Sequence, residues 1–209
     1  MSERPKYQAK IENRISEYPY GMAFSASDFL DIADSNSVSQ ALFRIEKDGV
    51  IRRVITGIYD KPIYSQVIHE YGVPRVDKVA EALARRFNWN IAPSGDTVLN
   101  ILHISTQVPN EWEYVSDGPY RDYMVGNIPL KFRHVMPREI NGYSKITVMV
   151  IQGIRAVGKG HMTQELADLF SSVITADEKK ILLAEARTAS AWIYKEIKGF
   201  CEERCKALL

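Results

Sequence analysis

Cysteine is nearly absent from this chain, which has only Cys201 and Cys205 among its 209 residues. The two lie four positions apart in GFCEERCKALL, so they share one turn if the segment is helical. A zinc site needs three or four ligands, and no histidine or third cysteine is near in the sequence, so no metal site is expected. Two cysteines also exclude a scaffold of several disulfides, and we expect both to be reduced thiols.

The chain also lacks an excess of charge of either sign. It has 27 Lys and Arg against 26 Asp and Glu, a formal net charge of +1. No overall field therefore attracts a polyanion, and any contact with nucleic acid has to come from local geometry. With 45% hydrophobic and 25% charged residues, the composition is that of an ordinary globular protein of one domain or two small ones.

Long apolar segments are missing as well. No run approaches the roughly 18 apolar residues that indicate a membrane-spanning helix. The polar N-terminus, MSERPKYQAK, shows no signal-peptide pattern. We therefore expect a cytoplasmic protein without a membrane partner.

Catalytic motifs are equally scarce. The four histidines are scattered without an HExxH pair, and no serine lies in a GxSxG elbow. Gly153 and Gly158, followed by Lys159, have the spacing of a phosphate-binding loop, but the next residue is Gly160, which lacks the hydroxyl that would hold magnesium. The run from Lys145 to Val157 is too long for a typical strand and predicts a helix that ends at Gly158. We expect neither an enzyme nor a bound cofactor.

What the chain does contain, between Ser37 and Pro62, is the pattern of a short helix followed by a basic hairpin. Val38, Ala41, Leu42 and Ile45 recur at spacings of three and four, which predicts one buried helix face. Ser37 is the expected N-cap and Gly49 the expected stop. Two runs rich in β-branched residues then flank Thr56-Gly57, a pair suited to a tight hairpin.

The preceding segment supplies the rest of a helix-turn-helix. Tyr7, Ile11 and Ile15 repeat at helical spacing, and Tyr18 to Gly21 breaks the pattern. Ser25 or Ser27 can cap a short helix that continues to Ile32, and Asp34-Ser35-Asn36 makes the turn into the next helix. The sequence thus predicts a winged helix-turn-helix.

A helix of this kind suits the DNA major groove, because amide, hydroxyl and guanidinium groups reach base edges while Arg and Lys bind phosphates. We expect Gln40 to read bases, with Ser39 and Arg44 in support. The full set of expected DNA-binding residues is Ser37, Ser39, Gln40, Arg44, Lys47, Arg52, Arg53 and Lys61. An apolar stripe opposite a polar face also describes any surface helix, so the pattern alone leaves both interpretations open.

The rest of the chain predicts a second domain of mixed helices and strands. Tyr64 to Arg75 is interrupted by Gly72 and Pro74, so we expect domains at 1–63 and 75–209. Beyond it we expect helices opened by Asp77, Asp96, Thr163 and the Thr175 capping box, and strands at Trp112–Val115, Tyr123–Val125 and Ile128–Val135. The expected fold class is α+β, with a small antiparallel sheet and a helical C-terminal end after the winged helix.

Four stretches resemble a known family, the last of them more weakly. The run FSASDFLDIADSNSVSQALFRIEKDGVIRRVITGIYDKP resembles the N-terminal winged helix of AbiEi-type antitoxins and of their uncharacterised relatives in bacteria and archaea. The resemblance continues through RVDKVAEALARRFNWNIAPSGDTVLNILHISTQVP and YVSDGPYRDYMVGNIPLKFRHV, and more weakly near ARTASAWIYKEI. Many winged-helix regulators share the first part, whereas PSGDTVLNILHISTQVP followed by YVSDGP is more distinctive.

The resemblance implies an antitoxin of a type IV toxin–antitoxin (abortive infection) operon. Such a protein represses its own promoter by binding inverted repeats in double-stranded DNA, and it counters a nucleotidyltransferase-like toxin that it need not touch. The residues leave one alternative open: a winged-helix regulator whose C-terminal domain senses a small molecule or is an unrecognised nucleotide-binding enzyme.

Overall fold

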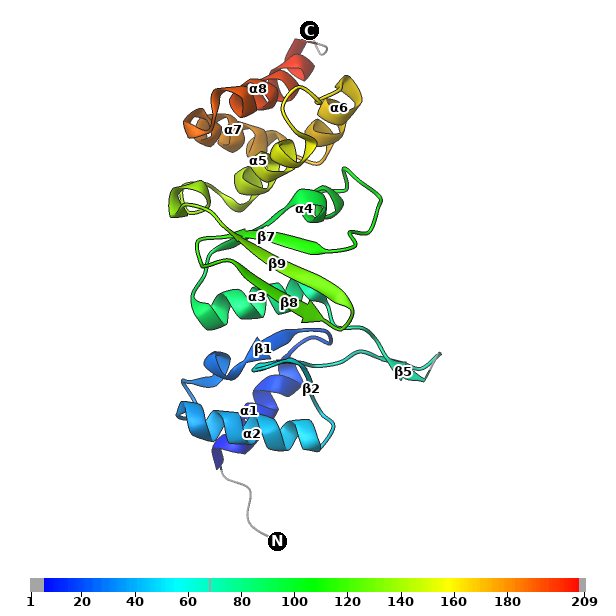
Figure 1. The fold of residues 1–209 in the computed structure, drawn as a ribbon, viewed down its shortest axis with the longest axis vertical. Helices are drawn as coiled ribbons and strands as arrows, with labels where there is room; N and C mark the ends of the chain where they lie inside the picture. Colours follow the sequence, from blue (N-terminus) through cyan, green and yellow to red (C-terminus); the bar gives the residue numbers. More distant parts are fainter. Residues whose placement is uncertain (1–5, 68, 207–209) are drawn as a thin grey trace. The chain divides into compact units, whose positions relative to one another are not determined.

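The computed structural model describes residues 6–67 and 69–206, without the side chains of 203–206. The fold is α+β, and the chain forms two compact units (Figure 1). The first unit comprises residues 1–89 and 123–130, and the second comprises 90–122 and 131–209. The expected division at 63–75 differs from this one, because the helix that follows residue 75 belongs to the first unit.

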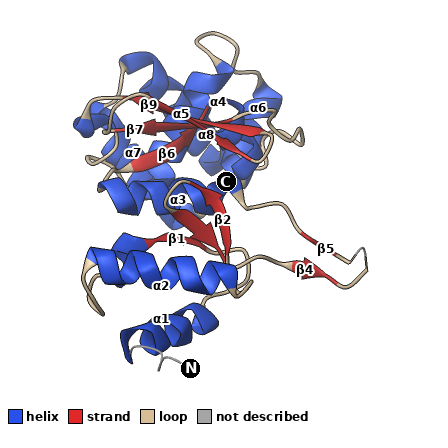
Figure 2. Ribbon diagram, turned by 60° about the horizontal axis from the view of Figure 1, so that its bottom comes forward, coloured by secondary structure: helices blue, strands red, loops and turns tan. Residues whose placement is uncertain are grey.

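The first unit begins with two helices and a small antiparallel sheet, which Figure 2 shows stacked on one another. In chain order the elements are α1 (Lys6–Glu17), β1 (Ala23–Ser25), the 3-10 turn η1 (Ala26–Phe29), α2 (Ser35–Lys47), β2 (Arg52–Ile55) and β3 (Ile58–Asp60). The strand order is β1-β3-β2. The predicted hairpin at Thr56-Gly57 is confirmed, with Gly57 at a φ of 78°. The predicted short helix after Ser25 is a single 3-10 turn, and β1 is too short to have left a sequence pattern.

The start of α2 differs from the prediction. Its N-cap is Asp34, whose carboxylate accepts hydrogen bonds from the backbone N–H of Asn36 and Ser37 at 3.0 and 3.1 Å. The Ser37 hydroxyl donates to the same carboxylate at 2.7 Å, and these bonds lower the pKa of Asp34. Ser37 as N-cap is therefore wrong, because aspartate three residues earlier already satisfies the free N–H groups of the first turn. Gly49, at a φ of 75°, follows the end of the helix as predicted.

The predicted apolar face of α2 is confirmed, since its four residues are buried in one core with α1 and the sheet. This core consists of Ile11, Ile15, Phe24, Phe29, Val38, Ala41, Leu42, Ile45, Ile51 and Tyr59. Burial of so many large side chains fixes the rotation of α2 about its axis. The same polar residues of α2 therefore always face the solvent.

The first unit continues with a small hairpin and a third helix. β4 (Tyr64–Ser65) and β5 (Glu70–Tyr71) pair antiparallel in a hairpin that projects from the unit (Figure 2). α3 (Val76–Phe87) buries one apolar face, and its Arg85 forms an ion pair with Asp28, with Nε and Oδ1 2.7 Å apart. Arg85 also donates to the carbonyl of Ala23. These contacts explain why α3 belongs to the first unit.

The rest of the chain contains the larger sheet and the C-terminal helices. The strands of this sheet and the helix between the first two are β6 (Ile91–Ser94), α4 (Gly95–Ile101), β7 (Trp112–Ser116), β8 (Arg121–Val125) and β9 (Ile128–His134), with sheet order β6-β7-β9-β8. After them come η2 (Pro137–Glu139), α5 (Lys145–Val157), α6 (Gln164–Ser172), α7 (Ala176–Glu185), η3 (Ala186–Thr188) and α8 (Ala191–Lys206). The three predicted strands and the caps at Thr163 and Thr175 are confirmed. The strand β6 was not predicted.

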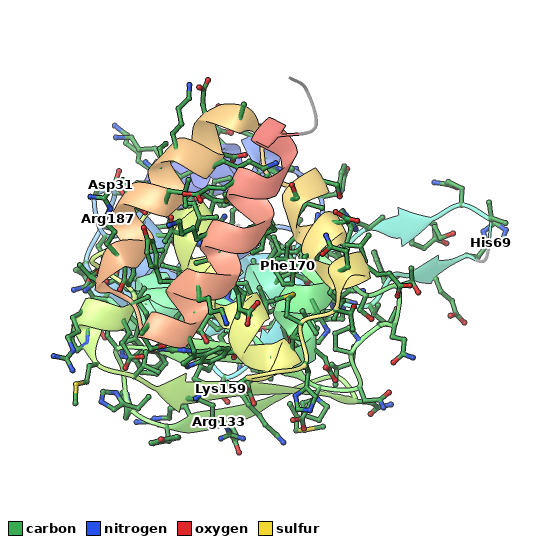
Figure 3. The ribbon with its side chains drawn as sticks, turned by 90° about the horizontal axis from the view of Figure 1, so that it is seen from above. Asp31, His69, Arg133, Lys159, Phe170 and Arg187 are labelled. Atoms are coloured by element: carbon green, nitrogen blue, oxygen red, sulfur yellow. The ribbon has the colours of Figure 1, made fainter. Side chains whose placement is uncertain are left out.

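The segment with phosphate-loop spacing is helix α5, as predicted, and it ends at Gly158. Gly153 lies within the helix, where a Cβ would be 2.9 Å from Cε1 of Phe170. Phe170, a residue of α6, is fully buried (Figure 3) and stacks on Phe200 of α8 at 5.8 Å between ring centroids. Both glycines therefore have structural roles, one in packing and one in ending the helix.

We expect Gly153→Ala to destabilise the chain, because the Phe170 ring has no room to move. Gly199→Ala is the matched control, since nothing lies within 4 Å of its Cβ position. Alanine is favoured over glycine in both helices by about 1 kcal/mol. Steric overlap should therefore make Gly153→Ala less stable than Gly199→Ala by about 1–3 kcal/mol in urea unfolding. Equal stability of the two variants would contradict this packing role.

Candidate nucleic-acid interface

The exposed face of α2 carries half of the side chains expected to bind DNA. Ser39, Gln40, Arg44 and Lys47 are all exposed, and Asn36 in the first turn is exposed with them. They are spaced so that they share the surface opposite the buried stripe. The structure thus brings together four of the eight predicted residues.

Ser37 and Arg44 differ in how they lie on this surface. Ser37 is half-buried, and its hydroxyl is bonded to the Asp34 cap. The Arg44 side chain lies beside α1, where its Nη1 makes a long hydrogen bond of 3.4 Å to Oε1 of Gln8. This weak contact orients the guanidinium of Arg44 while leaving it at the surface.

Arg52 makes strong bonds within the unit. Its guanidinium binds the Asp60 carboxylate through two hydrogen bonds, of 3.0 Å from Nε and 2.6 Å from Nη2. Its Nη1 donates to the carbonyl of Gly72 at 2.9 Å. Asp60 is only 1% exposed, so Arg52 neutralises a buried charge. A phosphate contact by Arg52 stays a prediction, and it would have to compete with these bonds.

Lys61 and Arg53 have different surroundings. Lys61 donates to the carbonyls of Ser16 and Tyr18 at 2.7 and 2.8 Å, beside the C-terminus of α1, where a cation is favourable. Arg53 bonds to the Tyr59 hydroxyl and pairs with Glu46 at 3.2 Å, and its side chain is 44% exposed. Of the three cations predicted on the hairpin, Arg53 is the most accessible.

One cation near α2 was not predicted. Arg86 of α3 is exposed and donates to the carbonyl of Thr56 at the hairpin turn, at 2.8 Å. A Cβ at Gly57 would lie 2.3 Å from its Nη1, so Arg86 lies directly against the turn. It lines a hollow of about 250 Å³ together with Ser27, Ser35 and Ser39. The sequence offered no signal for this, because α3 was assigned to the other domain.

One apolar residue on the same face was also missed. Phe43 is 46% exposed, and Nζ of Lys47 lies 4.6 Å from the centroid of its ring. Sequence reasoning passed over it because an apolar residue in an amphipathic helix is normally assigned to the core. Its place between Gln40 and Lys47 makes it part of the exposed surface.

Other chemistry is sparse in the part of the chain that the structure describes. Among those residues no three His, Cys, Asp or Glu side chains gather as they would around a metal ion. Cys201 is buried, which raises the pKa of its thiol to about 11 and makes it unreactive, whereas the side chain of Cys205 lies outside the described residues. None of the described helices is both long and apolar enough to span a membrane.

The second unit has a cleft with a volume of about 690 Å³. Its lining includes Arg138, an ion pair of 2.8 Å between Arg155 and Glu139, and a hydrogen bond of 3.0 Å between the hydroxyls of Thr188 and Tyr143. Ile151 and Ala189 add apolar surface. The cleft therefore offers cationic, hydroxyl and apolar groups to a small ligand.

The chain matches a family whose description is "family of unknown function" (DUF6088). The match covers residues 10–182, which include α2, the β2–β3 hairpin and most of the second unit. No curated protein matches the chain. The chain therefore belongs to the DUF6088 family.

Proposed function

We propose that the first unit is a winged helix-turn-helix that binds double-stranded DNA, with α2 as the recognition helix and the β2–β3 hairpin as the wing. The observation that carries this proposal is the exposed polar face of α2, on a helix whose rotation is fixed by a buried core. The order of α1, η1, α2 and the hairpin agrees with that of winged-helix proteins.

The side chains divide into three groups by their surroundings. In this proposal Gln40 and Ser39 contact base edges, because they are uncharged donors and acceptors in the first half of α2. Arg44 supports base reading from the same face. Lys47, Arg53 and Arg86 bind phosphates on either side of the groove, because they are exposed cations around that face. The other three predicted residues are bonded within the unit: Ser37 to the cap of α2, Arg52 within the wing and Lys61 to the end of α1. Their contacts with DNA stay predictions.

The resemblance to AbiEi-type antitoxins supports a narrower proposal. The chain acts in the cytoplasm as the antitoxin of a toxin–antitoxin operon, binds inverted repeats in its own promoter and counters a nucleotidyltransferase-like toxin. It is not an enzyme in this proposal. Direct contact with the toxin is not part of it, because type IV antitoxins need not bind their toxins.

Repression of its own promoter tests this function in cells. A reporter gene behind the upstream region should be silenced when the chain is expressed, and Gln40→Ala with Arg44→Ala should restore expression. Expression of a neighbouring nucleotidyltransferase-like gene should be toxic alone and tolerated with the chain. A reporter that responds equally to the chain and to the double variant would contradict the DNA-binding proposal.

The cleft in the second unit supports a second candidate function, in which that unit senses a small molecule. Its two arginines and its apolar patch suit an anionic ligand with an apolar part. Bound ligand should raise the melting temperature, and Arg155→Ala should reduce that rise. A flat response to ATP and GTP with magnesium would argue against nucleotides as that ligand.

A further inference from the structure

Phe43 is a large apolar side chain in the middle of the most polar surface of α2. Asn36, Gln40, Phe43 and Lys47 follow one another at spacings of four, three and four, so they form one stripe along the helix. All four are exposed, and Phe43 keeps 46% of its surface in contact with solvent. Removing an aromatic ring from water is favourable, so a partner that covers Phe43 would gain binding free energy.

The surroundings of Phe43 indicate the charge of that partner. Arg44 is its neighbour in sequence, and Nζ of Lys47 lies 4.6 Å from the ring centroid. Arg53, beyond the end of the helix, adds an exposed cation. An apolar group with a cation beside it complements a surface on which anionic and apolar groups are neighbours. The major groove has this character, because phosphates line its edges and thymine methyl groups lie on its floor.

We propose that Phe43 determines specificity by contacting the 5-methyl group of a thymine in the operator. This inference rests on the proposed function, with α2 in the major groove. A residue three positions after Gln40 lies about 4.5 Å further along the helix axis, since the rise is about 1.5 Å per residue. One base pair spans about 3.4 Å. The thymine therefore lies one or two base pairs from the base that Gln40 reads, for which adenine is the preferred partner of glutamine.

Lys47 has a second role in this arrangement. In the free protein its ammonium group lies over the Phe43 ring and shields part of it from water. Near DNA the stronger attraction of a phosphate draws the ammonium away and exposes the ring to the groove. The cation and the aromatic ring thus act together, one on the backbone and one on a base.

Replacement of single thymines by uracil tests this contact, because uracil differs only in lacking the methyl group. The full chain is titrated against its upstream fragment, with each thymine of the bound region replaced in turn. One thymine in each half-site should weaken binding by about fourfold when replaced, the equivalent of one buried methyl group. Phe43→Ala should show the same loss on unmodified DNA and no further loss with uracil at that position.

Two further variants complete the experiment. Phe43→Leu should keep the preference for thymine over uracil, because leucine is also apolar and long enough to reach the groove floor. Val73→Ala removes an apolar side chain that is 81% exposed on the first unit but lies outside α2, and it should behave like the wild type. Two results would overturn the inference alone while sequence-specific binding remains: Phe43→Ala still distinguishes thymine from uracil at the position where the wild type does, or the wild type binds equally well with uracil at each position. Absence of sequence-specific binding would overturn the proposed function itself, and the inference with it.

Discussion

Replacing both Gln40 and Arg44 by alanine is expected to abolish the preference of the chain for its upstream DNA while leaving it folded. Gln40 is an exposed amide in the first half of α2, and Arg44 is held at the surface by one weak bond to Gln8. A base contact of this kind contributes about 1–3 kcal/mol of discrimination. The double variant should therefore lose roughly 10²- to 10⁴-fold in specificity.

Phosphate contacts provide the control for that experiment. Lys47→Ala or Arg53→Ala should weaken binding to upstream and scrambled DNA alike, and each should reduce the slope of log affinity against log salt by about 1. Fluorescence anisotropy with the two DNA fragments at several salt concentrations measures both effects. If the double variant loses affinity for the upstream and the scrambled fragment by the same factor, Gln40 and Arg44 do not read sequence.

Arg52→Ala is expected to lower the free energy of unfolding by about 3–5 kcal/mol, a far larger effect than on most surface residues. The Asp60 carboxylate is 1% exposed, and removing Arg52 leaves that charge buried without its bidentate partner. The bond from Arg52 to the Gly72 carbonyl, which holds the base of the β4–β5 hairpin, is lost as well. Urea unfolding followed by circular dichroism measures the loss.

Arg53→Ala is the matched control, because Arg53 is the next residue on the same strand. Its pair with Glu46 is solvent-exposed, and such pairs contribute at most about 1 kcal/mol. Replacing both Arg52 and Asp60 by apolar residues should recover much of the stability, since no charge then remains buried. Equal stability of Arg52→Ala and Arg53→Ala would contradict the structural role of the Arg52–Asp60 pair.

Periodicity in the sequence predicted the parts of this fold that depend on local pattern. The buried face of α2, the Thr56-Gly57 hairpin and α5 follow from spacing and turn residues, and all three are confirmed. The cap of α2 was misplaced because Asp34 and Ser37 both have side chains that can cap, and only the backbone conformation decides between them.

The environments of the basic residues could not be predicted from the sequence. Lys61 bonds to the carbonyl of Ser16, 45 positions earlier, and Arg86 reaches Thr56 across 30 positions. A pattern of charges gives the sign of a surface but not the partners that fix each side chain. The exposure of Phe43 could not be predicted from the sequence either, because an apolar residue in an amphipathic helix is normally assigned to the core.

If α2 reads DNA sequence, the chain must bind its own upstream DNA more tightly than other DNA, and the affinity ratio between two fragments measures this. The purified full chain is titrated at physiological salt with its upstream region and with a scrambled fragment of the same length and composition. We expect a preference of about 10³-fold for the upstream region, the lower end of the range for specific DNA-binding proteins. Equal affinity for the two fragments would contradict it.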